Sequence, residues 1–410
     1  MVNQSFTLKQ FKKLRKRGDY YKFDNGKVDC EKLNNVLQEL ENLLYNINEY
    51  KFTELKTDIR NKKKIYLFDK DIKESLYDDF ILRKINHNIK RIYKVKQSNR
   101  NNIINQIYNL LNEKMPCYVY RLDIKSFYES INRDKILCKI LNSSIITTET
   151  KLLLEKFFSI IPDTTGLPRG LNISATLSEL YMKDFDHEII NLDGVYYYAR
   201  FVDDIIIFST KDIDKKDLSD ILIDKTLLNF NDDKTQKLFL DYKKRERLEY
   251  LGYEFVIIPN SKSLKDNIIV NIANKKINKI KSRIIYSLIN YSKNLNFELL
   301  KKRILFLTCT YPIKTSQQKI SPYKNSGYLQ AGLLYNYYKL SLNNDSLKEL
   351  DNFLRNILFS KNQYSRSLSK EQKKILARFS FVEAYKRKIT RNFYTSFKNF
   401  KEITRCWDYV

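Results

Sequence analysis

The sequence is poor in the residues that build several common kinds of site. Its 410 residues include only 8 Gly, 6 Pro, 5 Cys, 2 His and 1 Trp. The two histidines, at positions 87 and 187, stand alone and are expected to be structural. The cysteines, at positions 30, 117, 138, 309 and 406, show no paired spacing. This spacing disfavours a zinc site and a disulfide framework, so we expect a reduced, cytoplasmic protein.

Long apolar runs are also missing. No stretch of about 20 uncharged apolar residues occurs, so no transmembrane helix is expected. The start of the chain, "MVNQSFTLKQFKKLRKRG", lacks the apolar segment of a signal peptide. A hydrophobic content of 43% over 410 residues nevertheless predicts a globular protein with two or three domains or subdomains.

Acidic residues are the minority, with 48 Asp and Glu against 75 Lys and Arg. Residues 261–410 hold 30 basic and 9 acidic residues, so most of the net charge of +27 lies there. A one-sided charge indicates a polyanionic partner, most often nucleic acid. A general excess of lysine is the alternative explanation, but it leaves the asymmetry unexplained.

Apolar spacing predicts an α+β chain. Residues 31–50, 81–113, 166–189 and 346–360 carry apolar side chains at helical spacing. Residues 116–128, 196–208 and 248–258 are predicted to be strands. Ser369 and Gln372 are spaced for a capping box. The pattern after residue 260 is helical almost to the end, so we place a domain boundary there, between 1–260 and 261–410.

The stretch "YYYARFVDDIIIF" (196–208) places two adjacent carboxylates, Asp203 and Asp204, between apolar runs. Two such charges about 5 Å apart repel by roughly 3 kcal/mol at an effective dielectric of about 20. Either the pair is ordinary turn chemistry at an exposed hairpin tip, or it binds a cation. A third carboxylate, Asp123, ends the apolar strand in "YRLDIKSFYESI". Three carboxylates without His or Cys favour Mg²⁺, and two ions about 3.5–4 Å apart serve nucleotidyl transfer.

Five blocks, in this order, carry a family resemblance: "DIKSFYESI", "GLPRGLNIS", "FVDDIIIF", "LNFNDDKTQ" and "LEYLGYEF". Their order and spacing over residues 80–258 resemble motifs A to E of reverse transcriptases. The resemblance implies a right-hand polymerase, with fingers and an antiparallel-sheet palm in residues 1–260. A strongly basic α-helical thumb or nucleic-acid-binding domain would follow in residues 261–410.

The resemblance also implies the metal ligands. Asp123 and Asp203 resemble the two principal ligands, the carbonyl of Ile124 an additional one, and Asp204 would support the metal and the primer end. Lys234 resembles the motif D lysine that protonates departing pyrophosphate. A solvated loop lysine is the alternative for Lys234.

Further residues resemble the nucleotide site. Tyr128 lies where these polymerases keep a ring that excludes a ribose 2′-hydroxyl, although strand packing would also explain it. Gly170 would let the backbone approach the nucleotide or template. Arg169 stands where retroviral enzymes usually carry Gln, and its donors would meet the triphosphate or template. Lys94, Lys96 and Arg100 lie where the fingers supply bases to incoming phosphates, unless they form only a basic helix face.

The "RLDIKSFYESI" and "LPRGL" blocks and the helical extension most resemble bacterial abortive-infection and defence-associated reverse transcriptases. This implies Mg²⁺-dependent addition of dNTPs to a nucleic-acid 3′-hydroxyl or a protein hydroxyl, in anti-phage defence. RNA template or noncoding RNA, DNA product and a homo-oligomer are the implied partners. A retron- or intron-maturase-like reverse transcriptase working on its cognate RNA is one alternative, and a catalytically silent RNA-binding protein is another.

Overall fold

The computed structural model describes residues 2–16, 19, 30–60, 63–69, 73–163, 165–259, 268–313, 329–341, 344–390 and 402–407. These residues fall into two compact units. The first contains Met1–Asn99 and Cys117–Phe239, and the second contains Arg100–Pro116, Leu240–Thr315 and Gly327–Val410.

The first unit is built on a four-stranded sheet with the order β4-β5-β3-β6. Its strands are β3 (Cys117–Asp123), β4 (Val195–Phe201), β5 (Asp204–Ser209) and β6 (Gln236–Leu240). The central strand β5 pairs antiparallel with both β3 and β4. Residues 205–208 of β5 are all buried, because this strand has a neighbour on each side and helices against the sheet. The run "IIIF" is therefore the strand that carries the core of this sheet.

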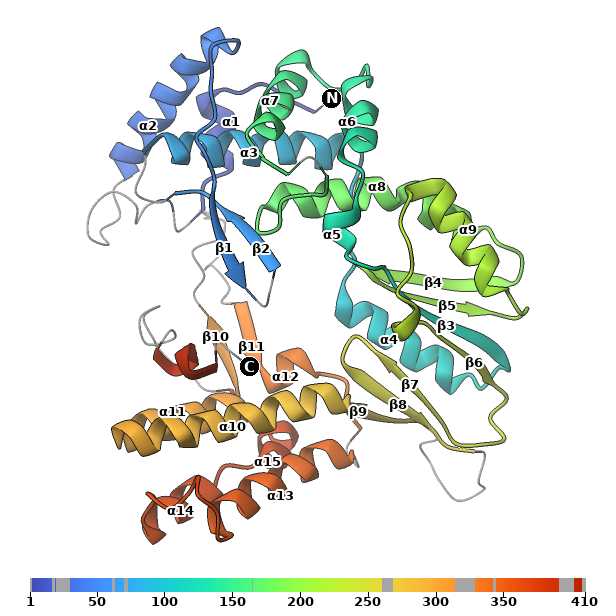
Figure 1. Cartoon of the computed structure of the whole chain (residues 1–410), viewed down its shortest axis with the longest axis vertical. Coiled ribbons are helices and arrows are strands. Elements are labelled where there is room, and N and C mark those ends of the chain that lie inside the picture. Colours follow the sequence, from blue (N-terminus) through green and yellow to red (C-terminus); the bar gives the residue numbers. More distant parts are fainter. Residues whose placement is uncertain are drawn as a thin grey trace. The chain divides into compact units, whose positions relative to one another are not determined.

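Helices surround this sheet and continue away from it (Figure 1). The longest two are α3 (Lys73–Ile92) and α8 (Asn172–Ile190), which contact each other, and α8 also contacts β4 and α9. A separate hairpin is formed by β1 (Lys56–Arg60) and β2 (Lys63–Leu67). The other helices of this unit are α1 (Leu8–Lys13), α2 (Cys30–Leu43), α5 (Phe127–Ser130), α6 (Arg133–Leu141), α7 (Thr148–Ser159) and α9 (Lys215–Thr226).

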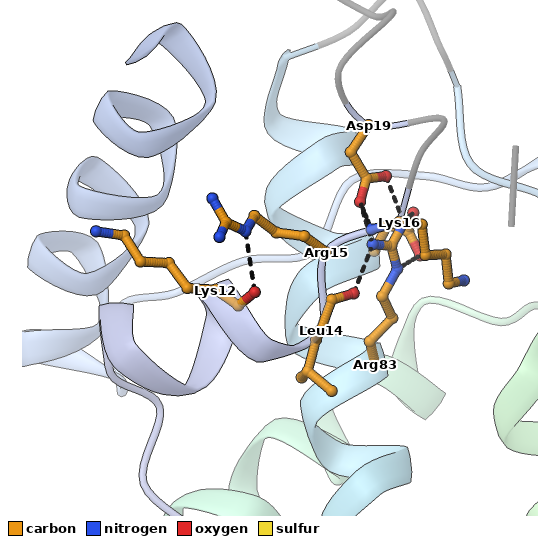
Figure 2. Close-up of polar contacts among 7 residues, drawn as sticks. Lys12, Leu14, Arg15, Lys16, Asp19 and Arg83 are labelled. Carbon is orange, nitrogen blue, oxygen red and sulfur yellow. Dashed lines mark hydrogen bonds and ion pairs between the residues drawn. The ribbon is translucent and has the colours of Figure 1, made fainter. Parts of the chain in front are cut away.

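A buried cluster of charges fastens the N-terminal segment to α3 (Figure 2). The guanidinium of Arg83 donates to both carboxylate oxygens of Asp19, at 2.7 and 2.8 Å, and to the carboxylate of Asp79. It also donates to the backbone carbonyl of Leu14, at 3.3 Å. Because Leu14 follows directly after α1, this arginine holds the end of that helix.

The second unit contains the three-stranded antiparallel sheet β7-β8-β9, with strands Glu246–Tyr250, Tyr253–Ile257 and Ile268–Ile272. A two-stranded sheet is formed by β10 (Thr310–Ile313) and β11 (Leu329–Gly332). Helix α10 contacts α11 and α13, and α13 also contacts β9. The helices are α4 (Arg100–Asn112), α10 (Asn274–Asn294), α11 (Phe297–Thr308), α12 (Leu333–Asn336), α13 (Asp345–Phe359), α14 (Lys370–Ala377) and α15 (Phe381–Lys386).

The structure confirms the predicted helices at 31–50, 166–189 and 346–360 as α2, α8 and α13, and the Ser369–Gln372 capping box at α14. After residue 260, where a helical pattern almost to the end is expected, the structure has helices α10 to α15 but also the strands β9, β10 and β11. Strand β9 pairs with β8 across residue 260, and the two compact units divide near residue 240. Among the described helices, none is long and apolar enough to cross a membrane.

Candidate active site

Backbone pairing brings the two acidic motifs together in the first unit. Asp123 is the last residue of β3, Asp204 is the first residue of β5, and the two are direct partners in the antiparallel register. Directly paired residues of antiparallel strands have Cβ atoms about 4.5–5.5 Å apart. Asp203 lies in the two-residue turn between β4 and β5, and its carbonyl accepts a hydrogen bond from Ile124 N–H at 3.1 Å. The structure thus places Asp123, Ile124, Asp203 and Asp204 at one end of the sheet.

A third segment reaches the same point. Asn231 N–H donates to the carbonyl of Asp123 at 2.7 Å, which draws the turn before β6 alongside β3. Lys234, in that turn, places its Nζ 2.9 and 3.1 Å from the two carboxylate oxygens of Asp123. Its side chain is 51% exposed, but it has a specific partner in the acidic site. The Lys234 ammonium is therefore paired with Asp123 while half of its side chain remains exposed.

The charges of this site affect one another. Burial raises the pKa of Asp203, and the charge of Asp123 adds to this effect. Burial, followed by the charges of Asp203 and Asp123, raises the pKa of Asp204 to about 6. The hydrogen bond to Asp123 raises the pKa of Lys234, so this side chain is a cation at neutral pH. The site holds more negative charge than Lys234 alone offsets.

The donor set fits a hard divalent cation in kind. Three carboxylates and the backbone carbonyl of Ile124 are oxygen ligands, and mutual repulsion among the carboxylates is relieved by a bound cation. Within the described part of the chain, however, no group of three or more His, Cys, Asp or Glu side chains is arranged to hold a metal ion. The carboxylate of Asp123 is instead paired with the ammonium of Lys234.

Tyr128 and Arg169 form a second cluster beside the acidic strands. The guanidinium of Arg169 lies over the ring of Tyr128, 4.8 Å from its centroid. The same guanidinium donates to Glu129, with Nη2 3.0 Å from Oε2. Burial raises the pKa of the Tyr128 hydroxyl. The donors that the sequence assigned to a triphosphate or template are thus partly occupied by Glu129, which also fixes the guanidinium over the ring.

Gly170 has a structural role that the sequence did not suggest. With φ of +97°, it lies against β2, where a Cβ atom would come within 2.5 Å of Ile65 Cγ2 and 2.6 Å of the Tyr66 carbonyl. Tyr66 N–H also donates to the carbonyl of Arg169 at 2.7 Å. The close approach observed at Gly170 is therefore to the β1–β2 hairpin.

A groove of about 650 Å³ lies between this hairpin and the "GLPRG" segment. Four of its lining residues are basic: Lys63, Lys64, Arg133 and Arg169. Lys63 also acts on the acidic site: burial raises the pKa of Asp203, and the charge of Lys63 offsets a small part of this rise. Sequence reasoning missed Lys63, Lys64 and Arg133. The basic run at residues 62–64, directly before the apolar strand of β2, was the available signal.

The bases predicted upstream lie elsewhere. Lys94 and Lys96 are exposed after α3, and neither is among the residues that line the groove. Arg100 belongs to the second unit, where it donates to the carbonyls of Leu251 and Asn336, each at 2.6 Å. Its guanidinium also lies 4.9 Å from the ring centroid of Tyr253. Arg100 is thus bound to the turn between β7 and β8 and to the end of α12.

Among solved structures, the chain is similar to a telomerase from Candida albicans in complex with a TWJ fragment of telomeric RNA. The identity is 10% and the TM-score 0.38, over 89% of this chain and 65% of the telomerase chain. The chain thus spans just under two thirds of that protein. A search of the curated proteins found no match.

The family comparison covers more than half of the chain. Residues 26–255 match the model of the reverse transcriptase (RNA-dependent DNA polymerase) family. This range includes the acidic strands, the "GLPRG" segment, Lys234 and the β7–β8 hairpin. The chain belongs to the reverse transcriptase family.

Proposed function

We propose that this protein is an RNA-directed DNA polymerase that adds dNTPs to a nucleic-acid 3′-hydroxyl or a protein hydroxyl. The observation that carries the proposal is the direct pairing of Asp123 with Asp204, beside Asp203, in a chain of this family. Asp123 and Asp204 lie on the adjacent strands β3 and β5, and Asp203 lies in the turn between β4 and β5. Together they supply the oxygen ligands that two-metal nucleotidyl transfer needs.

Asp123, Asp203, Asp204 and the carbonyl of Ile124 would hold two Mg²⁺ ions. When bound, such ions lower the pKa of an attacking hydroxyl and stabilise charge on a leaving pyrophosphate. A metal ion and the ammonium of Lys234 would compete for the same Asp123 carboxylate. When the ion binds, Lys234 would therefore leave Asp123 and contact the nucleotide instead.

Lys234 supplies the proton in this proposal. Its raised pKa keeps Nζ protonated at neutral pH. A protonated amine beside the acidic turn can donate to the departing pyrophosphate oxygen as a general acid. Lys234 thus offsets negative charge before the reaction and transfers a proton during it.

Tyr128 and the groove would select and bind the nucleotide. The Tyr128 ring contacts the guanidinium of Arg169 and, edge to face, the ring of Phe127, with the two ring centroids 5.3 Å apart. A fixed ring excludes a 2′-hydroxyl more effectively than a mobile one. Of the groove residues, the exposed Lys63 is suited to phosphate oxygens, whereas Lys64 is paired with Asp163 and Arg133 donates to the carbonyls of Gly166 and Thr165. Lys96 remains a proposed phosphate contact. The basic residues after 260 are proposed to follow a nucleic-acid backbone.

The test is incorporation of labelled dNTPs with Mg²⁺, with and without an RNA template, beside the variant Asp203→Ala/Asp204→Ala. We expect incorporation by the wild-type protein and a loss of at least about 1,000-fold in the variant. Incorporation that survives the double substitution contradicts the metal-site proposal.

Tyr128→Ala is expected to raise ribonucleotide incorporation relative to deoxynucleotide incorporation. An unchanged ratio of the two would contradict the proposal that Tyr128 excludes the 2′-hydroxyl.

We also propose a role in anti-phage defence, because the "RLDIKSFYESI" and "LPRGL" blocks resemble those of defence-associated members.

The same incorporation assay addresses how synthesis is primed and whether it needs a template. Label that remains with the protein after nuclease treatment would support priming from a protein hydroxyl and untemplated synthesis. Strict dependence on template would favour a retron- or maturase-like enzyme with a cognate RNA. The elution volume on size-exclusion chromatography tests the proposed homo-oligomer.

A further inference from the structure

The turn that carries Asp203 has an unusual backbone. Val202, which precedes Asp203, has φ of +63°. This left-handed conformation is unfavourable for β-branched residues, which are found there only when the surroundings impose it. The question is therefore which contacts impose it here.

One of the contacts is made by Arg200, the last residue but one of β4. Its Nη1 donates to the carbonyl of Val202 at 3.1 Å. On the other side of the turn, the carbonyl of Asp203 accepts from Ile124 N–H. The two successive carbonyls of the turn are thus bound by Arg200 of β4 and by Ile124, the residue that follows β3.

Arg200 is itself fixed by two carboxylates from α8. Its Nε and Nη2 lie 2.8 and 2.7 Å from the two oxygens of Asp186, and Nη2 lies 2.8 Å from Glu179 Oε2. Glu179 and Asp186 are seven residues apart, which places both on one face of the helix. The Arg200 side chain is only 4% exposed. A buried guanidinium with two charged partners has one orientation, so its remaining donor points at a defined position.

We propose that Arg200, anchored by Glu179 and Asp186, is a positioning residue that sets the backbone of the Val202–Asp203 turn and thereby holds the Asp203 carboxylate near Asp123. The helix α8 acts through Arg200 on the acidic turn without touching the reacting atoms. For its effect on catalysis, the inference rests on the proposed polymerase function. Its effect on the turn is structural and can be tested by itself.

The test compares Arg200→Lys with Arg83→Lys. Arg83 is a matched control: it lies in the same unit, is 9% exposed, and also binds two carboxylates and one backbone carbonyl. Lysine keeps the charge in both variants but loses the fork that binds several partners at once. For Arg200→Lys we expect kcat for dNTP incorporation to fall about 10- to 100-fold, with the KM for dNTP changed less than about 2-fold. Arg83→Lys is expected to keep kcat, after correction for folded protein.

Hydrogen exchange measured on the same proteins gives a readout independent of activity. Arg200→Lys is expected to speed exchange in peptides covering residues 199–206 and 121–126, and Arg83→Lys to leave both unchanged. Unchanged exchange and unchanged kcat in Arg200→Lys would overturn the inference. If the wild-type protein incorporates no dNTP, the proposed function is wrong, and exchange alone decides the role of Arg200.

A second variant covers the case in which Arg200→Lys fails to fold. Arg200→Met/Glu179→Gln/Asp186→Asn removes the donor to Val202 and leaves no unpaired buried charge. It is expected to fold and to show the same loss of kcat and the same faster exchange. Wild-type kcat in this folded variant would show that the turn needs no support from Arg200.

Discussion

Arg83 and Arg200 have nearly the same chemistry in two regions of the first unit. Each is a buried guanidinium that binds two carboxylates and one backbone carbonyl. The carbonyl at Arg83 belongs to Leu14, which ends the first helix (Figure 2). The carbonyl at Arg200 belongs to Val202, in the turn that carries Asp203. The same set of interactions therefore fastens a terminal segment in one place and shapes a candidate active site in the other.

The comparison teaches that the backbone carbonyl bound by each guanidinium decides what that arginine does in the structure. In both clusters burial by itself lowers the pKa of the guanidinium, and the neighbouring carboxylates more than offset it, so the pKa is raised. Both arginines are therefore permanent cations. Their roles differ because only the carbonyl of Val202 lies beside the acidic residues of the candidate active site.

The largest expected effect is on stability, and it should be equal in the two regions. Arg83→Met and Arg200→Met each leave two carboxylates without their cation, which costs about 3–5 kcal/mol in the free energy of unfolding. Urea denaturation followed by circular dichroism measures this. Replacing the carboxylates as well, in Arg83→Met/Asp19→Asn/Asp79→Asn, should restore most of the stability and leave kcat at the wild-type value.

The corresponding triple variant at Arg200 should regain stability but not activity. A stable and fully active triple variant at Arg200 would contradict the proposed difference between the two regions. A loss of kcat in the folded Arg83 triple variant would contradict it as well.

A similar contrast exists between two lysines of the first unit. Lys234 pairs with Asp123, and Lys237 pairs with Asp212, each with a side chain about half exposed. The Lys237–Asp212 pair is exposed on both sides, and such pairs contribute about 1 kcal/mol or less to stability, whereas the Asp123 carboxylate is only 9% exposed. Lys234→Met is expected to lower kcat about 100-fold through loss of the general acid, while Lys237→Met keeps it. Single-turnover measurement of dNTP incorporation distinguishes the two, and equal kcat values in the two variants would contradict a general-acid role for Lys234.

The sequence predicted the acidic pair well, because the information is local. The run "FVDDIIIF" contains both the strand and the turn, and the structure places Asp203 and Asp204 on them. Asp123 required only the expectation that the two strands are neighbours, which their direct register confirms. Motif order along the chain was enough for this part of the site.

The supporting contacts were not predictable in the same way. Arg200 meets Glu179 and Asp186 only because α8 packs beside β4, and nothing in the sequence fixes that packing. Arg100 looked like a phosphate-binding residue because it follows a basic helix, but its donors go to the carbonyls of Leu251 and Asn336, both distant in sequence. The basic groove depends on the β1–β2 hairpin meeting the "GLPRG" segment, more than 100 residues away. Charge patterning finds charged residues but does not find their partners.

The Arg83 region has a neighbour whose charge depends on pH. Burial, with a smaller effect from Lys13, lowers the pKa of Lys84 to about 8, although its Nζ donates to the carbonyl of Asn3 at 2.7 Å. Unfolding returns this pKa to its ordinary value, so between about pH 8 and pH 10.5 the unfolded state binds more protons. Stability should therefore rise with pH in that interval, by roughly 3 kcal/mol.

The difference between the wild-type protein and Lys84→Met isolates this effect from the other titrating groups. Denaturation at several pH values should show the wild-type protein gaining relative to the variant as the pH rises. A difference that does not change with pH would mean that Lys84 keeps its proton in the folded state. The Arg200 region should show no such dependence, since no lysine is among the side chains bonded to its guanidinium in the described structure.

The smallest expected effect concerns the two residues whose carbonyls the arginines bind. Val202 has φ of +63°, whereas Leu14 has φ of −99° and is buried. Glycine at position 202 relieves a strain of about 1–3 kcal/mol, and its greater freedom in the unfolded chain offsets part of this gain. Val202→Gly should therefore raise the free energy of unfolding by about 1 kcal/mol, whereas Leu14→Gly should lower it.

Glycine at position 202 adopts the positive φ without strain, so the turn of Val202→Gly should depend less on the hydrogen bond from Arg200. Adding Arg200→Lys to Val202→Gly should then cost less kcat than Arg200→Lys alone, and equal losses would show that Arg200 does not act through this turn.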